Sequence, residues 1–182
     1  MRRPIAIVIA SLVFGALSGV AAYQKVRPVA ASDGHHWQEI AWPYPRDGWP
    51  AGRAFRCDGC AAPIELYVRP KIGFCNCDAG VADDDEVDRV ADLDLISDRF
   101  APQAPGRVIR VADLSGRSRA YDLDMPGGAR HAAVGIAVSH RCDLLIAVVQ
   151  GGARADELQR EAVAFLTTEG MQHWMMVALG SR

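Results

Sequence analysis

Four of the five cysteines of this 182-residue chain lie between positions 57 and 77, and this cluster limits what the surrounding segment can fold into. The four form two close pairs, Cys57 with Cys60 and Cys75 with Cys77, while Cys142 lies far downstream. Such a cluster suits two disulfides, a thiolate metal site or a redox-active C-x-x-C pair. The compartment in which the chain folds bears on this choice, because disulfides form and persist mainly in oxidising surroundings.

The amino terminus predicts export. Arg2 and Arg3 give it a positive start, and residues 5–23 follow without one charged side chain. This run has no polar face, unlike a helix packed on a cytosolic domain. Residues 1–31 are therefore expected to be a cleaved signal peptide or a retained membrane anchor, with the amino end in the cytoplasm. Many arginines beside two lysines are typical of GC-rich bacterial coding, so we expect the remainder in the periplasm, released or anchored to the inner membrane by residues 5–23.

In the periplasm the clustered cysteines are expected to form disulfides. Cys75 and Cys77 are too close to bond to each other without strain, so each is expected to pair with Cys57 or Cys60. Cys142 is then the odd thiol. Each bridge would stabilise the irregular chain around it by about 2–4 kcal/mol.

Two other uses of these cysteines stay open. One is a zinc or copper site in a metal-handling protein, built from Cys57, Cys60, Cys75 and Cys77 with His35 and His36 as further candidate ligands. The second pair is C-x-C, whereas structural zinc sites usually have two C-x-x-C pairs. The other is thiol–disulfide exchange, although Asp58 lies inside the C-x-x-C motif and no helix pattern follows it.

Hydrophobic patterning predicts an antiparallel sheet. Five segments have the alternation or composition of strands: 63–69, 107–113, 119–123, 132–139 and 144–149. The last two are the most apolar and are expected to pair at the sheet centre. A hairpin turn is expected at residues 114–117 and a second turn at residues 126–128.

Helices are predicted on either side of these strands. Asp83 and Glu86 have the spacing of a capping box at the start of a short helix. A second helix begins near Asp156, has an apolar face and ends at Gly170, whereas residues 171–179 fit a helix or a strand. The chain is therefore predicted to be one α+β domain over residues 57–182, with a central antiparallel sheet packed by one or two helices. A disulfide-stapled, Trp/Pro-rich irregular segment (32–56) and the N-terminal apolar helix precede it. The prolines of this segment remove backbone donors, so from Trp37 onward it is expected to be irregular chain or an edge strand.

Charge and motifs favour a binding role over catalysis. The net charge of −2 provides no field for nucleic acid, and no nucleophile, metalloprotease or phosphate-binding motif is present. An acidic stretch at 78–98 precedes five arginines between Arg99 and Arg119, so the two stretches would pair within the fold or form a two-signed docking surface.

The aromatic residues before the cysteine cluster are the other docking candidates. They would line a ligand groove or pack under a proline-rich loop: Trp37, Trp42, Tyr44 and Trp49. We predict a non-catalytic accessory or binding protein without a cofactor, which docks another periplasmic or inner-membrane protein and meets the membrane only through residues 5–23.

Overall fold

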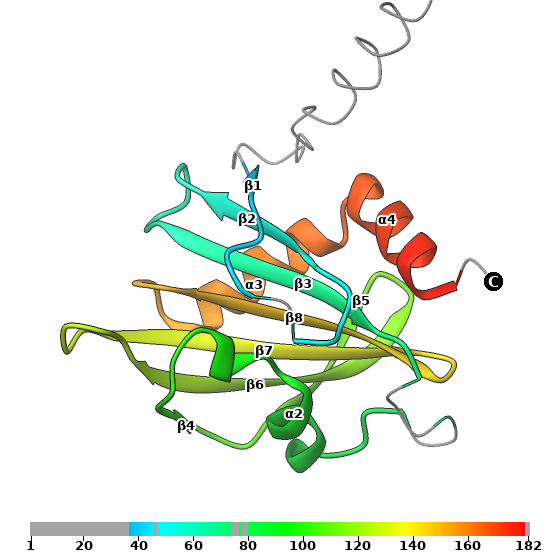
Figure 1. The fold of residues 1–182 in the computed structure, drawn as a ribbon, viewed down its shortest axis with the longest axis horizontal. Coiled ribbons are helices and arrows are strands. Elements are labelled where there is room, and N and C mark those ends of the chain that lie inside the picture. The colour runs from blue at the N-terminus through cyan, green and yellow to red at the C-terminus, as the bar shows by residue number, and fades with distance from the viewer. Residues whose placement is uncertain (1–36, 46, 74–76, 78–79, 181–182) are drawn as a thin grey trace, which may run out of the picture.

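Eight antiparallel strands form one sheet in the computed structural model, which describes residues 37–45, 47–73, 77 and 80–180 (Figure 1). The strands are β1 (Trp37–Ile40), β2 (Arg53–Cys57), β3 (Ile64–Lys71), β4 (Phe100–Pro102), β5 (Arg107–Val111), β6 (Leu114–Asp124), β7 (Arg130–His140) and β8 (Asp143–Gly151). Their order is β1-β2-β3-β8-β7-β6-β4, and β5 also pairs with β6. The expected α+β domain with a large antiparallel sheet is confirmed.

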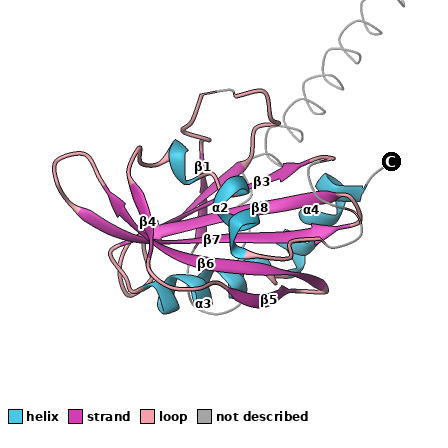
Figure 2. Cartoon of the chain, turned by 90° about the horizontal axis from the view of Figure 1, so that it is seen from below, coloured by secondary structure: helices cyan, strands magenta, loops and turns pink. Residues whose placement is uncertain are grey.

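Helices cover both faces of the sheet (Figure 2). On one face α3 (Ala155–Leu166) and α4 (Glu169–Gly180) pack on a core that includes Val134, Ile136 and Leu145. On the other face α2 (Asp84–Val90) and the 3-10 helix η1 (Leu93–Leu95) pack on a second core. Because β7 and β8 are buried on both faces, they are continuous apolar runs, which explains why the sequence predicted them at the centre.

The start of α2 follows local rules, while the end of α3 does not. The Asp83 carboxylate accepts the Glu86 backbone N–H at 2.9 Å, which confirms the capping box of α2. The expected end of α3 at Gly170 is wrong, because α3 stops at Leu166 and Gly170 lies in the first turn of α4. The Thr167 and Thr168 hydroxyls donate to the Val163 and Phe165 carbonyls and satisfy the last turn of α3.

The hairpin turn expected at residues 114–117 is also wrong. Ala112 and Asp113 form the turn, with Ala112 at a φ of 51°, and the predicted turn residues belong to β6. Gly116 has another purpose there: a Cβ on it would lie 2.1 Å from the Ala137 carbonyl oxygen of β7. This glycine allows two strands to approach closely.

The Trp/Pro-rich segment enters the sheet. Residues 37–56, expected to be irregular chain or an edge strand, contribute the edge strand β1 and most of β2, with an irregular loop between them. The expected N-terminal helix lies outside the described residues. Within the described segments, no helix has the length and apolar character needed to cross a membrane.

Candidate functional site

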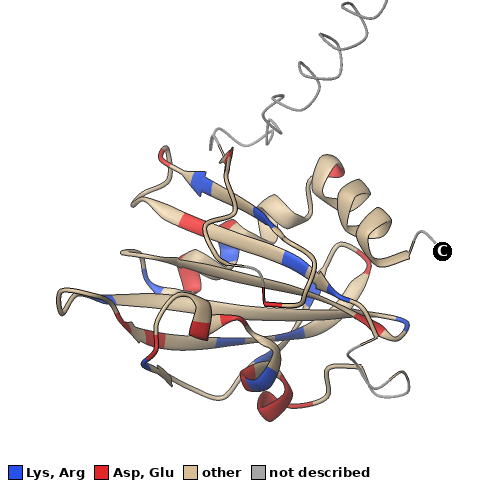
Figure 3. Ribbon diagram, in the orientation of Figure 1, with Lys and Arg blue, Asp and Glu red and all other residues tan. Residues whose placement is uncertain are grey.

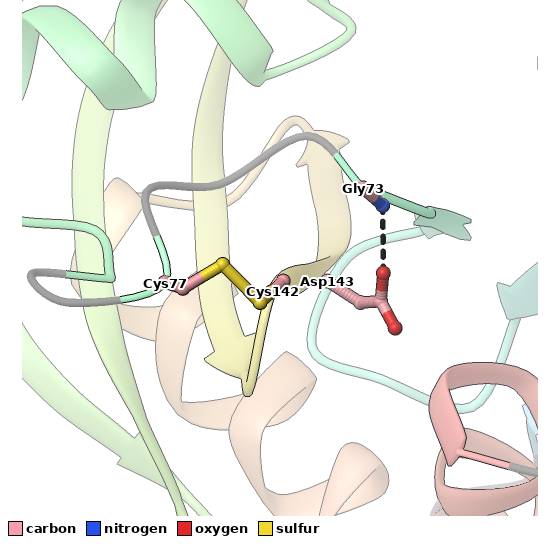
Figure 4. The surroundings of a disulfide bond; sticks show 4 residues. All are labelled: Gly73, Cys77, Cys142 and Asp143. Carbon is pink, nitrogen blue, oxygen red and sulfur yellow. Dashed lines mark hydrogen bonds between the residues drawn. A yellow bond between two sulfur atoms is a disulfide. The ribbon is translucent and has the colours of Figure 1, made fainter.

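Two disulfides join the cysteines in a pattern that differs from the expected one. Cys57 bonds to Cys60, and Cys77 bonds to Cys142 (Figure 4), so the expected pairing across the cluster is wrong and Cys142 is not the odd thiol. The reason is β3, an eight-residue strand that begins shortly after Cys60 and ends before Cys77. An extended strand of this length holds its two flanking segments far apart, at opposite ends.

The second disulfide fastens the chain after β3 to the tip of the central hairpin. Cys142 lies in the turn between β7 and β8, and beside it the Asp143 carboxylate accepts the Gly73 backbone N–H at 2.6 Å (Figure 4). Both contacts hold a long connection against the same turn. Two disulfides of this kind indicate an oxidising, exported environment.

The described cysteines are bonded in disulfides and are not available as thiolate ligands or nucleophiles. The sulfurs of Cys57, Cys60 and Cys77 are in disulfides, so a thiolate metal site would first require their reduction. Among the residues that the structure describes, no three His, Cys, Asp or Glu side chains gather to hold a metal. The other proposed ligands lie outside the described residues: His35, His36 and Cys75. Cys57 is fully buried, and bends and β3 follow its partner where a reactive C-x-x-C usually opens a helix.

The four aromatic candidates pack on the domain in different ways. Trp37 is buried and stacks on Phe165 of α3 with ring centroids 4.8 Å apart, so its ring belongs to the core. Trp42 and Tyr44 contact each other and Tyr67 of β3 edge to face. Trp42 and Tyr44 are half-buried on the strand, as packing under a proline-rich loop requires.

A buried charged cluster anchors the loop between β1 and β2. Arg69 of β3 forms ion pairs with Asp92 near η1 and with Asp47 of the loop, at 2.5 and 2.7 Å. Lys71 shares Asp92 at 2.8 Å and lies 5.7 Å from the ring centroid of Trp49. Burial alone would lower the pKa of Arg69, but its hydrogen bonds to Asp92 and Asp47 raise it, so the guanidinium is permanently charged. The cluster joins the loop, β3 and the chain after α2.

A polar network on β3 completes this face. Glu65 accepts hydrogen bonds from Tyr67, from Arg56 at 2.6 Å and from Gln150 at 3.1 Å, and Gln150 contacts His131 at 2.7 Å. Burial would raise the pKa of Glu65, but the bonds from Tyr67 and Arg56 lower it below its usual range. The carboxylate is therefore ionised and its oxygens are already occupied by donors, which is a structural arrangement rather than that of a proton donor.

The acidic and arginine-rich stretches pair within the fold, but incompletely. Arg117 bonds to Asp84 at 2.5 Å and Arg119 bonds to Asp88 at 2.6 Å, which joins β6 to α2. Figure 3 shows the acidic residues of α2 beside the basic positions of β6. Arg99 approaches Asp124 at 3.8 Å. The two remaining arginines of the stretch, Arg107 and Arg110, are on β5 and form no ion pair with a described residue.

Those two arginines line a groove between β5 and α3. The groove has a volume of about 610 Å³ and is lined by Arg107, Ile109, Arg110, Asp156, Gln159, Arg160, Val163 and Ala164. We call it the arginine groove. Its three arginines form no ion pair with any residue in the described part of the chain. Its one carboxylate, Asp156, is bound to Arg154 at 2.7 Å. The groove lining thus carries three arginines against one carboxylate, on a chain of net charge −2.

Sequence reasoning drew attention to two of the three groove arginines. The arginine stretch drew attention to Arg107 and Arg110 as docking candidates, but Arg160 on α3 carried no signal of its own. No known protein-family model matches the chain, and no curated protein sequence matches it significantly.

Proposed function

We propose that this is an exported, non-catalytic accessory protein of the bacterial periplasm, which docks an acidic surface of another envelope protein in the arginine groove. The observation that supports it is that Arg107, Arg110 and Arg160 line one groove and form no ion pair with any described residue. Their unmatched charge makes an acidic surface the natural complement.

Arginine is well suited to such a surface. Its planar guanidinium binds carboxylates with two parallel hydrogen bonds, and it is enriched at protein interfaces. Ile109 and Val163 add apolar side chains to the lining of the groove beside the arginines. The metal-handling and thiol-exchange alternatives have no comparable supporting observation in the described segments.

Photocrosslinking in the native bacterium tests this proposal. A photoreactive amino acid replaces Ala164, an exposed residue of the groove, in the full chain. We expect a discrete adduct that disappears when Arg107, Arg110 and Arg160 are changed to Glu. The matched control reverses three other exposed arginines, Arg89, Arg99 and Arg130, and should keep the adduct. An adduct equally strong in the groove variant, or no adduct in the parent, would overturn the proposal.

A further inference from the structure

The arginine groove runs beside a strand edge that has no partner strand among the described residues. β5 pairs with β6 from Arg107↔Ser118 to Val111↔Leu114, across a two-residue turn. In such a hairpin the two residues that flank the turn hydrogen-bond to each other through their backbones. Every second pair of facing residues further from the turn does the same. Val108 and Arg110 therefore direct their backbone N–H and C=O groups away from β6. No backbone hydrogen bond reaches these groups from other described residues.

β4, the other strand on this side of β6, is unsuited to pair with an additional strand. β4 is three residues long and ends in Pro102, which has no backbone donor. β5 has five residues and no proline, so it offers a regular edge to an additional strand.

The side chains of β5 indicate which strand would fit. Ile109 packs against the core under α3, so Arg107, two positions away, shares its face and lines the groove. Val108 lies on the opposite face and is 76% exposed, the most exposed of the large apolar residues described. Arg110, two positions from Val108, shares that opposite face. An added strand would therefore meet Arg107 and Arg160 on its α3 side, and Val108 with Arg110 on its other side.

A second copy of this chain does not match that pattern. Pairing of β5 with β5 would bring the arginines of two copies together along one edge, and like charges in neighbouring strands are destabilising. The arginines thus disfavour self-association and leave an acidic strand as the complement.

We propose that the docked partner adds an extended segment to the outer edge of β5, with acidic side chains facing the arginine groove and alternating with apolar ones over Val108. This inference rests on the proposed function and specifies its binding mode. Main-chain hydrogen bonds to Val108 and Arg110 would provide affinity, and the arginine groove would select the alternating acids.

Synthetic peptides test strand addition directly. The probe is a labelled heptapeptide in which glutamate alternates with valine, titrated with the full chain by fluorescence anisotropy. Two derivatives carry N-methyl groups on either the glutamate or the valine amides. Because alternate amides of a strand point to opposite edges, we expect one derivative to bind like the parent and the other at least about tenfold more weakly. A peptide of the same composition with adjacent glutamates should bind weakly as well.

Variants of the protein complete the test. Val108→Pro removes an outward N–H at an edge position and should weaken binding of the parent peptide, whereas Val108→Thr keeps the donor and should not. If both methylated peptides bind like the parent, or none of the peptides binds, strand addition is overturned. The crosslinking result distinguishes these cases: a groove-dependent adduct in cells would leave the docking function standing, and its absence would remove both.

Discussion

Arg69 on β3 and Asp92 after α2 form a two-pronged ion pair, in which the arginine Nε and Nη2 donate to both carboxylate oxygens at 2.5 and 2.6 Å. Arg69 is 3% exposed and Lys71 contacts the same carboxylate, so Asp92 balances two buried cations. The pair therefore fixes the chain after α2 against β3, the strand on which Trp42 and Tyr44 also pack.

Removal of the shared carboxylate should be strongly destabilising. Asp92→Ala leaves Arg69 with one exposed partner and deprives Lys71 of its ion pair with Asp92, and an unbalanced buried charge costs about 3–5 kcal/mol. The free energy of unfolding in urea measures this loss. The matched variant Asp47→Ala removes the outer partner of Arg69 and should cost about 1 kcal/mol or less, because that pair is accessible to solvent. Equal losses in the two variants would show that Asp92 is not the anchor.

The pair between Arg69 and Asp47 should depend on pH in the acid range. The hydrogen bond from Arg69 lowers the pKa of Asp47 from 3.8 to about 2. A carboxyl group whose pKa is depressed by folding stabilises the protein above its unfolded pKa and loses that contribution as the pH falls to its folded pKa. The native chain should thus exceed Asp47→Asn in stability at neutral pH, and the gap should close between about pH 4 and pH 2. Urea titrations at several pH values measure the gap. A gap that stays constant over this window would contradict the assignment.

The two disulfides should contribute unequally to stability. Cys77 and Cys142 are 65 positions apart, whereas Cys57 and Cys60 are three apart. Loop-closure entropy predicts a loss of about 4 kcal/mol for Cys77→Ser with Cys142→Ser, and about 2 kcal/mol for Cys60→Ser. Denaturant unfolding of the oxidised proteins compares them. A larger loss for Cys60→Ser would mean that the short ring supports more of the fold than its length suggests.

Gly116 should be intolerant of a side chain. The added methyl group of Gly116→Ala would meet backbone of β7 at 2.1 Å, so the strands must separate at a cost of about 1–3 kcal/mol. Gly152→Ala is the matched control, because nothing lies within 4 Å of its Cβ position, and it should change stability by about 0.5 kcal/mol or less. Thermal unfolding of both variants decides this, and an unchanged midpoint for Gly116→Ala would argue against the close approach.

These cases show which features the sequence could predict. The central strands β7 and β8 and the cap at Asp83 follow from local composition, and both were predicted. Gly116 was assigned to a turn, because sequence alone does not show which strand approaches it. The disulfide pairing was missed for a similar reason: it depends on where β3 carries the chain. Likewise, no local pattern brings Arg160 of α3 beside Arg107 of β5, since only the packing of a helix on a sheet does so.

The groove arginines should be dispensable for stability. Changing Arg107, Arg110 and Arg160 one at a time to Glu breaks no ion pair with a described residue, so each should alter the free energy of unfolding by about 0.5 kcal/mol or less. Arg119→Glu is the contrast, because it places a negative charge beside Asp88, which also accepts the Tyr121 hydroxyl, and should cost about 1–3 kcal/mol. Urea unfolding at physiological salt measures all four variants. If a groove variant lost as much stability as Arg119→Glu, its arginine would be a structural residue and the case for docking would weaken. If all three are neutral while the peptide and crosslinking signals disappear, the groove charges serve binding rather than folding.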